Sequence, residues 1–172
     1  MGIAAAAGEA YGGLDAVVLN AGVGDSARAG DESVESWERT IHINLTGAFL
    51  VARATLPLLV ERRGALVGVA SVNAMRAGPG WASYCTSKAG LVMVCQTIAS
   101  DYGPSGVRAN AVCPGWVRTP MGDTDMDGLG DVCDALDPVF DGVIVGGGLA
   151  AAGVGLAARG GTPATTRDLV LT

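Results

Sequence analysis

The chain has 172 residues, of which 49% are hydrophobic and 16% are charged, and its mean hydropathy is +0.39. This is enough apolar material for one sizeable core, and it argues against an intrinsically disordered protein. The net charge of −6 lies entirely in residues 122–172, which hold eight aspartates and only two arginines, whereas residues 1–121 are neutral overall. We therefore predict two regions, a folded body over 1–121 and an acidic, Gly/Ala-rich, poorly ordered tail over 122–172.

Several classes of protein are disfavoured by the same sequence. No window reaches the ~18 uncharged apolar residues typical of a membrane-spanning helix, and the N-terminus lacks the basic segment of a signal peptide. The neutral body and acidic tail offer no basic surface for nucleic acid. The four cysteines lie ten or more residues apart and the chain has one histidine, so we expect reduced thiols and no metal site. We expect a cytoplasmic protein that binds neither membrane nor nucleic acid.

Strands and helices alternate along the predicted body. Short apolar runs rich in β-branched residues predict buried strands, and apolar residues at helical spacing predict two long helices. Pro57 falls inside the first helix and should bend it near its end, and Gly103-Pro104 should end the second. In chain order the predicted elements cover residues 14–20, 34–63, 65–70, 82–102 and 107–113.

This order predicts an α/β fold with a doubly wound parallel sheet and helices on its faces. In such sheets the ligand site lies outside the carboxyl ends of the strands. Asn20, Ser71 and Pro114-Gly115 stand at these ends. The fold therefore predicts where the site lies before any motif is considered.

A tyrosine and a lysine on the second helix suggest proton-transfer chemistry. Tyr84 and Lys88 are four residues apart, so their side chains project from one helix face. A nearby cation favours a phenolate, and we expect Lys88, with a cofactor charge, to lower the pKa of Tyr84 from about 10 towards neutrality. Ser71 could hold a substrate oxygen beside the phenol. Lys88 is also the one lysine among eleven basic residues, as expected where a compact ammonium is needed.

The surrounding motifs resemble the short-chain dehydrogenase/reductase family over roughly residues 11–121. The matching segments, in chain order, are LDAVVLNAG, SWERTIHINLTGAF, GALVGVASVNA, YCTSK and VRANAVCPGWVRTPM. The resemblance implies a Rossmann-like dinucleotide-binding domain, and an oxidoreductase that transfers hydride between NAD or NADP and an alcohol or ketone. It also implies a homo-oligomer, a dimer or tetramer, built on the two long helices.

The resemblance also assigns roles to individual residues. It implies a catalytic tetrad in which Tyr84 is the acid/base, Lys88 tunes it and binds the nicotinamide ribose, and Ser71 binds the substrate oxygen. The fourth member, Asn44, would hold a proton-relaying water; a structural role for this asparagine is the alternative. The cofactor-binding residues implied are Asn20, Ala21, Gly22, Tyr84, Lys88, Pro114, Gly115, Val117 and Thr119, with a purely structural turn as the alternative for Asn20 and Pro114.

The N-terminal part of the sequence departs from the family. The family begins with a strand and a glycine-rich phosphate-binding turn, and no G-x-x-x-G-x-G turn precedes Leu14. The residue that selects NAD or NADP would lie in the same part. We expect the domain to be N-terminally truncated and residues 1–172 to bind the cofactor poorly or not at all. The alternative function is a catalytically inactive family member that acts only as an assembly partner.

The tail offers two further motifs. Asp123, Asp125, Asp127, Asp131 and Asp134 have the spacing of a calcium loop, which leaves a calcium-binding module as another alternative to a solvated acidic loop or a substrate loop. Residues 143–151 read as a strand followed by G-x-G-x-x-A, a weak dinucleotide fingerprint in a glycine-rich context that disfavours a helix. From Gly130 onward no family resemblance is found, which is also compatible with an out-of-frame extension.

Overall fold

The computed structural model describes residues 2–115, 142–147 and 168–171. The fold is α/β, with a sheet in the order β1-β2-β3-β4-β5. The strands are β1 (Ala16–Leu19), β2 (Ala65–Val69), β3 (Arg108–Pro114), β4 (Gly142–Gly147) and β5 (Asp168–Leu171). The helices are α1 (Ile3–Tyr11), α2 (Val34–Ile41), α3 (Ala48–Arg62) and α4 (Ala82–Tyr102), with a π-helical segment, His42–Gly47, between α2 and α3, and short 3₁₀ turns at Val72–Ala74 and Gly103–Ser105.

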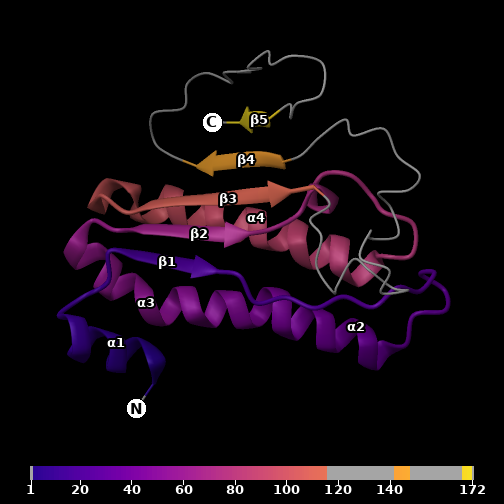
Figure 1. Cartoon of the computed structure of the whole chain (residues 1–172), viewed down its shortest axis with the longest axis horizontal. Coiled ribbons are helices and arrows are strands. Elements are labelled where there is room, and N and C mark those ends of the chain that lie inside the picture. Colours follow the sequence, from indigo (N-terminus) through magenta and orange to yellow (C-terminus); the bar gives the residue numbers. More distant parts are fainter. Residues whose placement is uncertain (1, 116–141, 148–167, 172) are drawn as a thin grey trace, which may run out of the picture.

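The first three strands form the predicted parallel sheet. Val18 pairs with Val67, and Val67 pairs with Asn110, so β1, β2 and β3 run side by side in the same direction. Figure 1 shows their carboxyl ends at one edge of the sheet, with α3 beside β1 and α4 crossing behind β2 and β3. The strand expected at the start of residues 143–151 is β4, which runs antiparallel to β3 and parallel to β5. These pairings were not anticipated from the sequence.

The core lies between the sheet and the helices α3 and α4. Alternate residues of β3 are buried, as expected for a strand covered on one face, and Ala111 and Cys113 are fully enclosed. They pack with buried residues such as Leu66 of β2, and Leu91 and Cys95 of α4. Gly68 allows α4 to approach closely, because a Cβ at this position would lie 2.7 Å from the Cys95 sulfur. This close packing fixes α4 against the strands whose carboxyl ends carry the predicted site.

The predicted long helix contains an irregularity at its centre. Ser33 caps its start by accepting a hydrogen bond from the Ser36 N–H at 3.1 Å, and Arg63, in the left-handed conformation, follows its end. Pro57 lies within α3, as predicted. The His42–Gly47 segment adopts the wider π-helical turn, a feature that frequently accompanies functional sites. Asn44, one of the predicted site residues, lies in this segment.

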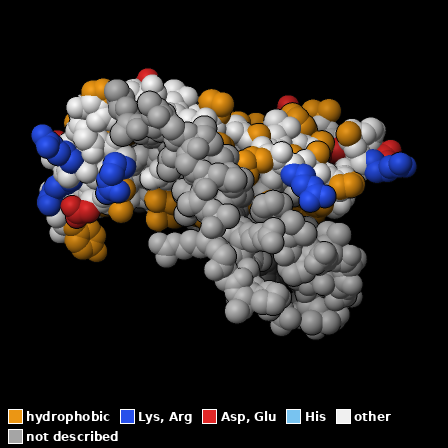
Figure 2. Space-filling model, turned by 90° about the horizontal axis from the view of Figure 1, so that it is seen from above, with side chains coloured by type: hydrophobic (Ala, Val, Ile, Leu, Met, Phe, Trp, Pro, Cys, Tyr) orange, Lys and Arg blue, Asp and Glu red, His pale blue; other side chains and the backbone are white. Residues whose placement is uncertain are grey.

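By length and composition alone, the helical stretch Val34–Arg62 could cross a membrane, a test that core helices of soluble proteins also pass. In this structure it contacts β1, β2 and α4. Several of its apolar side chains are nevertheless exposed, including Phe49, Leu50 and Val51, each close to half accessible. Hydrophobic side chains also reach the described surface in the view from above (Figure 2).

Candidate functional site

Tyr84 and Lys88 lie in the first two turns of α4, beside the carboxyl end of β2. The Lys88 side chain is 4% exposed, and its Nζ donates a hydrogen bond to the carbonyl oxygen of Val69, the last residue of β2, at 2.8 Å. The same nitrogen lies 5.6 Å from the centre of the Tyr84 ring. One of the three ammonium protons is thus used to anchor Lys88 to the strand end. The predicted pairing of Tyr84 with Lys88 is present in the structure.

Ser71 completes this group two residues after β2. It is 8% exposed, and its hydroxyl oxygen accepts a hydrogen bond from the backbone N–H of Asn73 at 3.1 Å. The side chain also lies near enough to Tyr84 to lower the pKa of the phenol through a hydrogen bond. The structure therefore brings Ser71, Tyr84 and Lys88 together at the carboxyl end of β2, as the sequence predicted.

The pKa of Tyr84 shifts in the direction opposite to that expected from the sequence. Burial of the phenol raises its pKa above 10.0, Ser71 opposes this, and the neighbouring Cys85 adds to it. Burial lowers the pKa of Lys88 from its ordinary value, and the nearby Cys113 partly offsets that effect. The lowering expected from Lys88 is not found in this structure, because burial of the phenol outweighs the hydrogen bond to Ser71, the one effect that lowers its pKa. Tyr84 therefore stays protonated at neutral pH.

Asn44 is fully buried and ties three parts of the chain together. Its Oδ1 accepts a hydrogen bond from the Val23 N–H at 2.8 Å, and its Nδ2 donates to the Val23 carbonyl at 2.8 Å and to the Ser87 hydroxyl oxygen at 3.0 Å. Ser87 in turn donates to the carbonyl of Tyr84 at 2.8 Å. Asn44 thus links the loop after β1 to the turn of α4 that carries the tyrosine.

The predicted cofactor residues are placed unevenly. Gly22 lies against the site, because a Cβ there would be 3.2 Å from the Lys88 Nζ and 3.6 Å from the Asn44 Oδ1. Asn20 and Ala21 are exposed directly after β1, while Pro114 ends β3 and Gly115 follows it, both half-buried. Val117 and Thr119, and the aspartates of the calcium-loop motif, lie outside the described residues. No cluster of three or more metal-binding side chains occurs among the residues that the structure describes.

Sequence reasoning did not identify the aromatic wall of the site. The Trp81 and Tyr84 rings meet edge to face, 5.4 Å apart at an interplanar angle of 70°. Both pack on Gly24, where a Cβ would lie 2.8 Å from Trp81 Cζ3 and 3.0 Å from Tyr84 Cδ2. Gly24, two positions after the Asn-Ala-Gly turn, was the one feature of the sequence that could have indicated this close contact. Its lack of a side chain lets the loop pass directly over the tyrosine.

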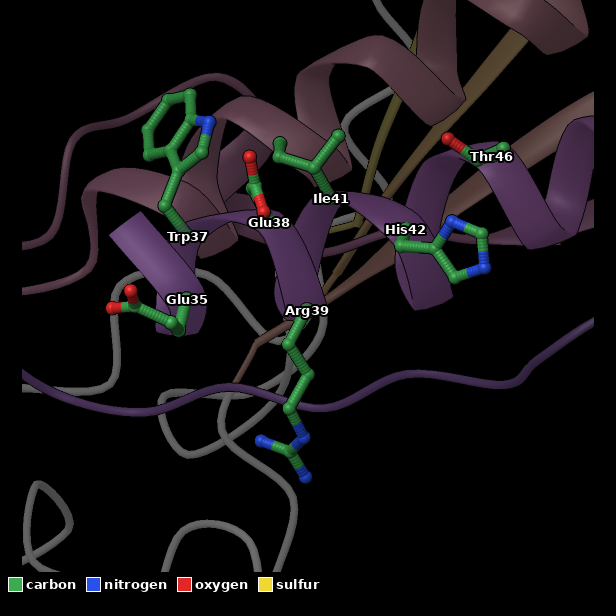
Figure 3. A pocket seen from close by; sticks show the side chains of 7 residues that line it. All are labelled: Glu35, Trp37, Glu38, Arg39, Ile41, His42 and Thr46. Carbon is green, nitrogen blue, oxygen red and sulfur yellow. The ribbon is translucent and has the colours of Figure 1, made fainter. Parts of the chain in front are cut away.

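A hollow on the outer face of α2 is separate from this group. In Figure 3, Trp37, Glu38 and Ile41 project to one side of the helix and Arg39 to the other. None of the predicted site residues contributes to it; its lining consists of Glu35, Trp37, Glu38, Arg39, Ile41, His42 and Thr46. We therefore place the candidate active site around Tyr84, where the side chains described above meet, and not in this hollow.

Known proteins share the sequence pattern and the fold of this chain. A family model described as enoyl-(acyl carrier protein) reductase matches residues 2–139. This match extends past Gly130, where the sequence analysis found the resemblance to end, and it crosses the boundary predicted at residue 121. The family match is therefore longer than the segments that carry recognisable motifs.

Individual relatives match only part of their own length. The chain is 52% identical over 86 residues to "Protein MoaE" of Klebsiella aerogenes, covering 50% of this chain and 34% of the relative. It is 40% identical over 121 residues to 2-(R)-hydroxypropyl-CoM dehydrogenase of Xanthobacter autotrophicus, covering 68% and 48%. A solved short-chain dehydrogenase/reductase from Burkholderia thailandensis superposes with a TM-score of 0.63 at 37% identity, covering 70% and 48%.

The chain thus spans about half or less of the length of these relatives. The family match nevertheless covers most of this chain, and the parallel strands and helices follow the same fold. The chain belongs to the short-chain dehydrogenase/reductase family of oxidoreductases.

Proposed function

We propose that this chain carries the catalytic part of an NAD- or NADP-dependent oxidoreductase that interconverts a small alcohol and its carbonyl compound. The observation that carries the proposal is the buried Lys88 ammonium, fixed to the end of β2 and 5.6 Å from the Tyr84 ring, with Ser71 beside them. A buried cation next to a phenol and a hydroxyl is suited to moving a proton on and off a substrate oxygen.

Tyr84 serves as the acid in carbonyl reduction. Burial raises the pKa of the phenol, so the O–H is intact at neutral pH and can be donated to a carbonyl oxygen as that oxygen gains negative charge. In the reverse direction Tyr84 has to lose its proton first, so alcohol oxidation should become faster as the pH rises. The raised pKa therefore favours reduction near neutral pH.

Ser71 and Lys88 each support this transfer. The Ser71 hydroxyl is oriented by the 3₁₀ turn that follows it and can donate to the same substrate oxygen. Among the residues that the structure describes, Lys88 bonds Val69 with one proton, which leaves two for a ribose hydroxyl and for stabilising a phenolate. The Asn44 side chain already forms hydrogen bonds with Val23 and Ser87. We therefore propose that a proton-relaying water binds either a backbone carbonyl of the π-helical turn or the remaining lone pair of the Asn44 Oδ1.

The described residues fit the nicotinamide end of the cofactor better than its pyrophosphate. The Lys88 ammonium lies against Gly22, whose lack of a side chain leaves room for it, and Pro114-Gly115 lies at the end of the neighbouring strand β3. Between 2 and 115 the structure contains no glycine-rich strand-to-helix turn of the type that holds a pyrophosphate. When bound, the cofactor supplies hydride transfer, while the protein supplies orientation and the proton.

We further propose that the chain forms a cytoplasmic homo-oligomer, a dimer or tetramer, through its long helices. The exposed side chains of Phe49, Leu50 and Val51 on α3 support this proposal. The same surface supports the alternative function, a catalytically inactive family member that acts only in assembly. Measurement of turnover and of oligomeric state on the same sample separates the two functions.

The decisive test compares Tyr84→Phe with wild type in ketone reduction by NADH and NADPH. The chain should be assayed alone and joined to the glycine-rich half of a family member. Loss of the proton donor should slow turnover by ~10²- to 10⁴-fold. Tyr102→Phe, on the same helix, is the matched control and should retain wild-type turnover. Equal rates with and without the Tyr84 hydroxyl would show that it is not the acid.

Binding measurements test the cofactor assignment without requiring turnover. Because the described residues lack a pyrophosphate turn, reduced nicotinamide mononucleotide and NADH should bind this chain with weak and similar affinity. Lys88→Met should weaken both. Tight stoichiometric binding of NADH, at least tenfold better than the mononucleotide, would show that another part of the chain holds the pyrophosphate.

A further inference from the structure

The start of α4 is held by a residue that lies far away in the sequence. Glu32, in the 23–32 loop between β1 and α2, accepts a hydrogen bond from the Ser83 hydroxyl through one carboxylate oxygen and from the Ser83 N–H, at 3.4 Å, through the other. Ser83 directly precedes Tyr84 and is fully buried. The contact therefore bridges 51 positions of sequence and ends next to the proposed catalytic tyrosine.

The helix has no local cap that could replace Glu32. Its N-cap residue is Trp81, whose indole cannot accept a hydrogen bond from the first backbone N–H groups. A carboxylate at this end satisfies one of those groups and is further favoured by the helix dipole. Glu32 is thus the side chain that supplies the capping acceptor, from outside the helix.

The rest of the 23–32 loop crosses the same turn of α4. Ala27 donates its N–H to the Gly80 carbonyl at 2.9 Å and forms an isolated parallel bridge with Trp81, and Gly24 packs on the Tyr84 ring. Asn44 fixes the beginning of the loop at Val23. The loop is therefore attached at both ends, by Asn44 and by Glu32, with Tyr84 between the two attachments.

We propose that Glu32 is a positioning residue for catalysis, which sets the first turn of α4 and thereby the orientation and burial of Tyr84. The inference rests on the proposed role of Tyr84. Removal of the carboxylate leaves the buried Ser83 hydroxyl without its partner and frees the loop that covers the tyrosine ring. More water then reaches the phenol, and the effect of burial on its ionisation decreases.

The test is the ionisation of Tyr84, followed by the ultraviolet absorbance of its phenolate and identified by subtracting a Tyr84→Phe background. In Glu32→Ala and in Ser83→Ala the pH midpoint of Tyr84 should fall by roughly half a unit or more. Glu32→Gln, which keeps an acceptor for Ser83, should restore most of the wild-type midpoint. Glu35→Ala, an exposed acidic residue of α2, should leave it unchanged.

An unaltered Tyr84 midpoint in both Glu32→Ala and Ser83→Ala would overturn the proposal, as would an equal change in Glu35→Ala. If Glu32→Gln shifts the midpoint as far as alanine does, Glu32 acts through its charge and not through position, which also overturns it. Should Glu32→Ala fail to fold, Ser83→Ala decides the matter by the same criterion. The titration needs neither cofactor nor substrate, so its result is independent of the turnover test of Tyr84→Phe.

Discussion

Replacement of Asn44 by alanine should destabilise the fold substantially, because this side chain joins the loop after β1 to α4. The substitution removes three hydrogen bonds, two to Val23 and one to Ser87, each with a net value of about 1 kcal/mol. Alanine returns about 0.5 kcal/mol through its higher helix propensity. The expected loss in the free energy of unfolding is therefore roughly 2.5 kcal/mol.

Urea denaturation followed by circular dichroism measures this loss as a lower midpoint at an unchanged slope. Asn110→Ala provides the control, because the Asn110 side chain on β3 makes no hydrogen bond within the described part of the chain. Ser87→Ala should also lower the free energy of unfolding less in the Asn44→Ala background than in wild type, since the two side chains are hydrogen-bonded to each other. A loss below about 1 kcal/mol, or one equal to that of Asn110→Ala, would refute the view that Asn44 holds the loop.

Two further predictions concern the site and the core. Gly22→Ala should impair nicotinamide binding, because the new Cβ would lie 3.2 Å from the Lys88 Nζ and displace the ammonium, and the free energy of unfolding should change by less than about 1 kcal/mol. Gly30→Ala is the control and should bind as wild type does, because no atom lies within 4 Å of its Cβ. If both variants bind equally well, the ammonium does not contact the cofactor. Burial raises the pKa of the Cys95 thiol from 9.0 to about 11, so the unfolded chain loses this proton first and stability should fall between pH 9 and 11 by up to about 3 kcal/mol. Denaturation at several pH values should show a shallower alkaline decrease in Cys95→Ala, and an identical decrease would contradict this origin.

The sequence predicted those parts of the fold that local patterns determine. The second long helix was predicted over residues 82–102, the bounds it has in the structure, because a stripe of apolar residues ends at Gly103-Pro104. The three parallel strands and the grouping of Ser71, Tyr84 and Lys88 followed from strand order and from the spacing of one helical turn.

Features that depend on distant contacts were not predictable in the same way. The π-helical turn around Asn44 has an ordinary helical sequence, and the side chain of this asparagine is hydrogen-bonded to backbone groups 21 residues earlier in the chain. The Glu32–Ser83 bond and the antiparallel pairing of β4 also join remote segments. The pKa direction of Tyr84 depends on how deeply the ring is buried, which residue types alone do not specify.

The most direct test of the central claim is the pH dependence of turnover for ketone reduction, measured for the chain joined to the glycine-rich half of a family member. If the partly buried Tyr84 phenol is the acid, the rate stays constant through neutral pH and falls only above the ordinary phenol pKa of 10.0. This alkaline decrease should be absent from the residual activity of Tyr84→Phe. A rate that already falls near neutral pH, or an alkaline decrease that persists without the hydroxyl, would contradict the account.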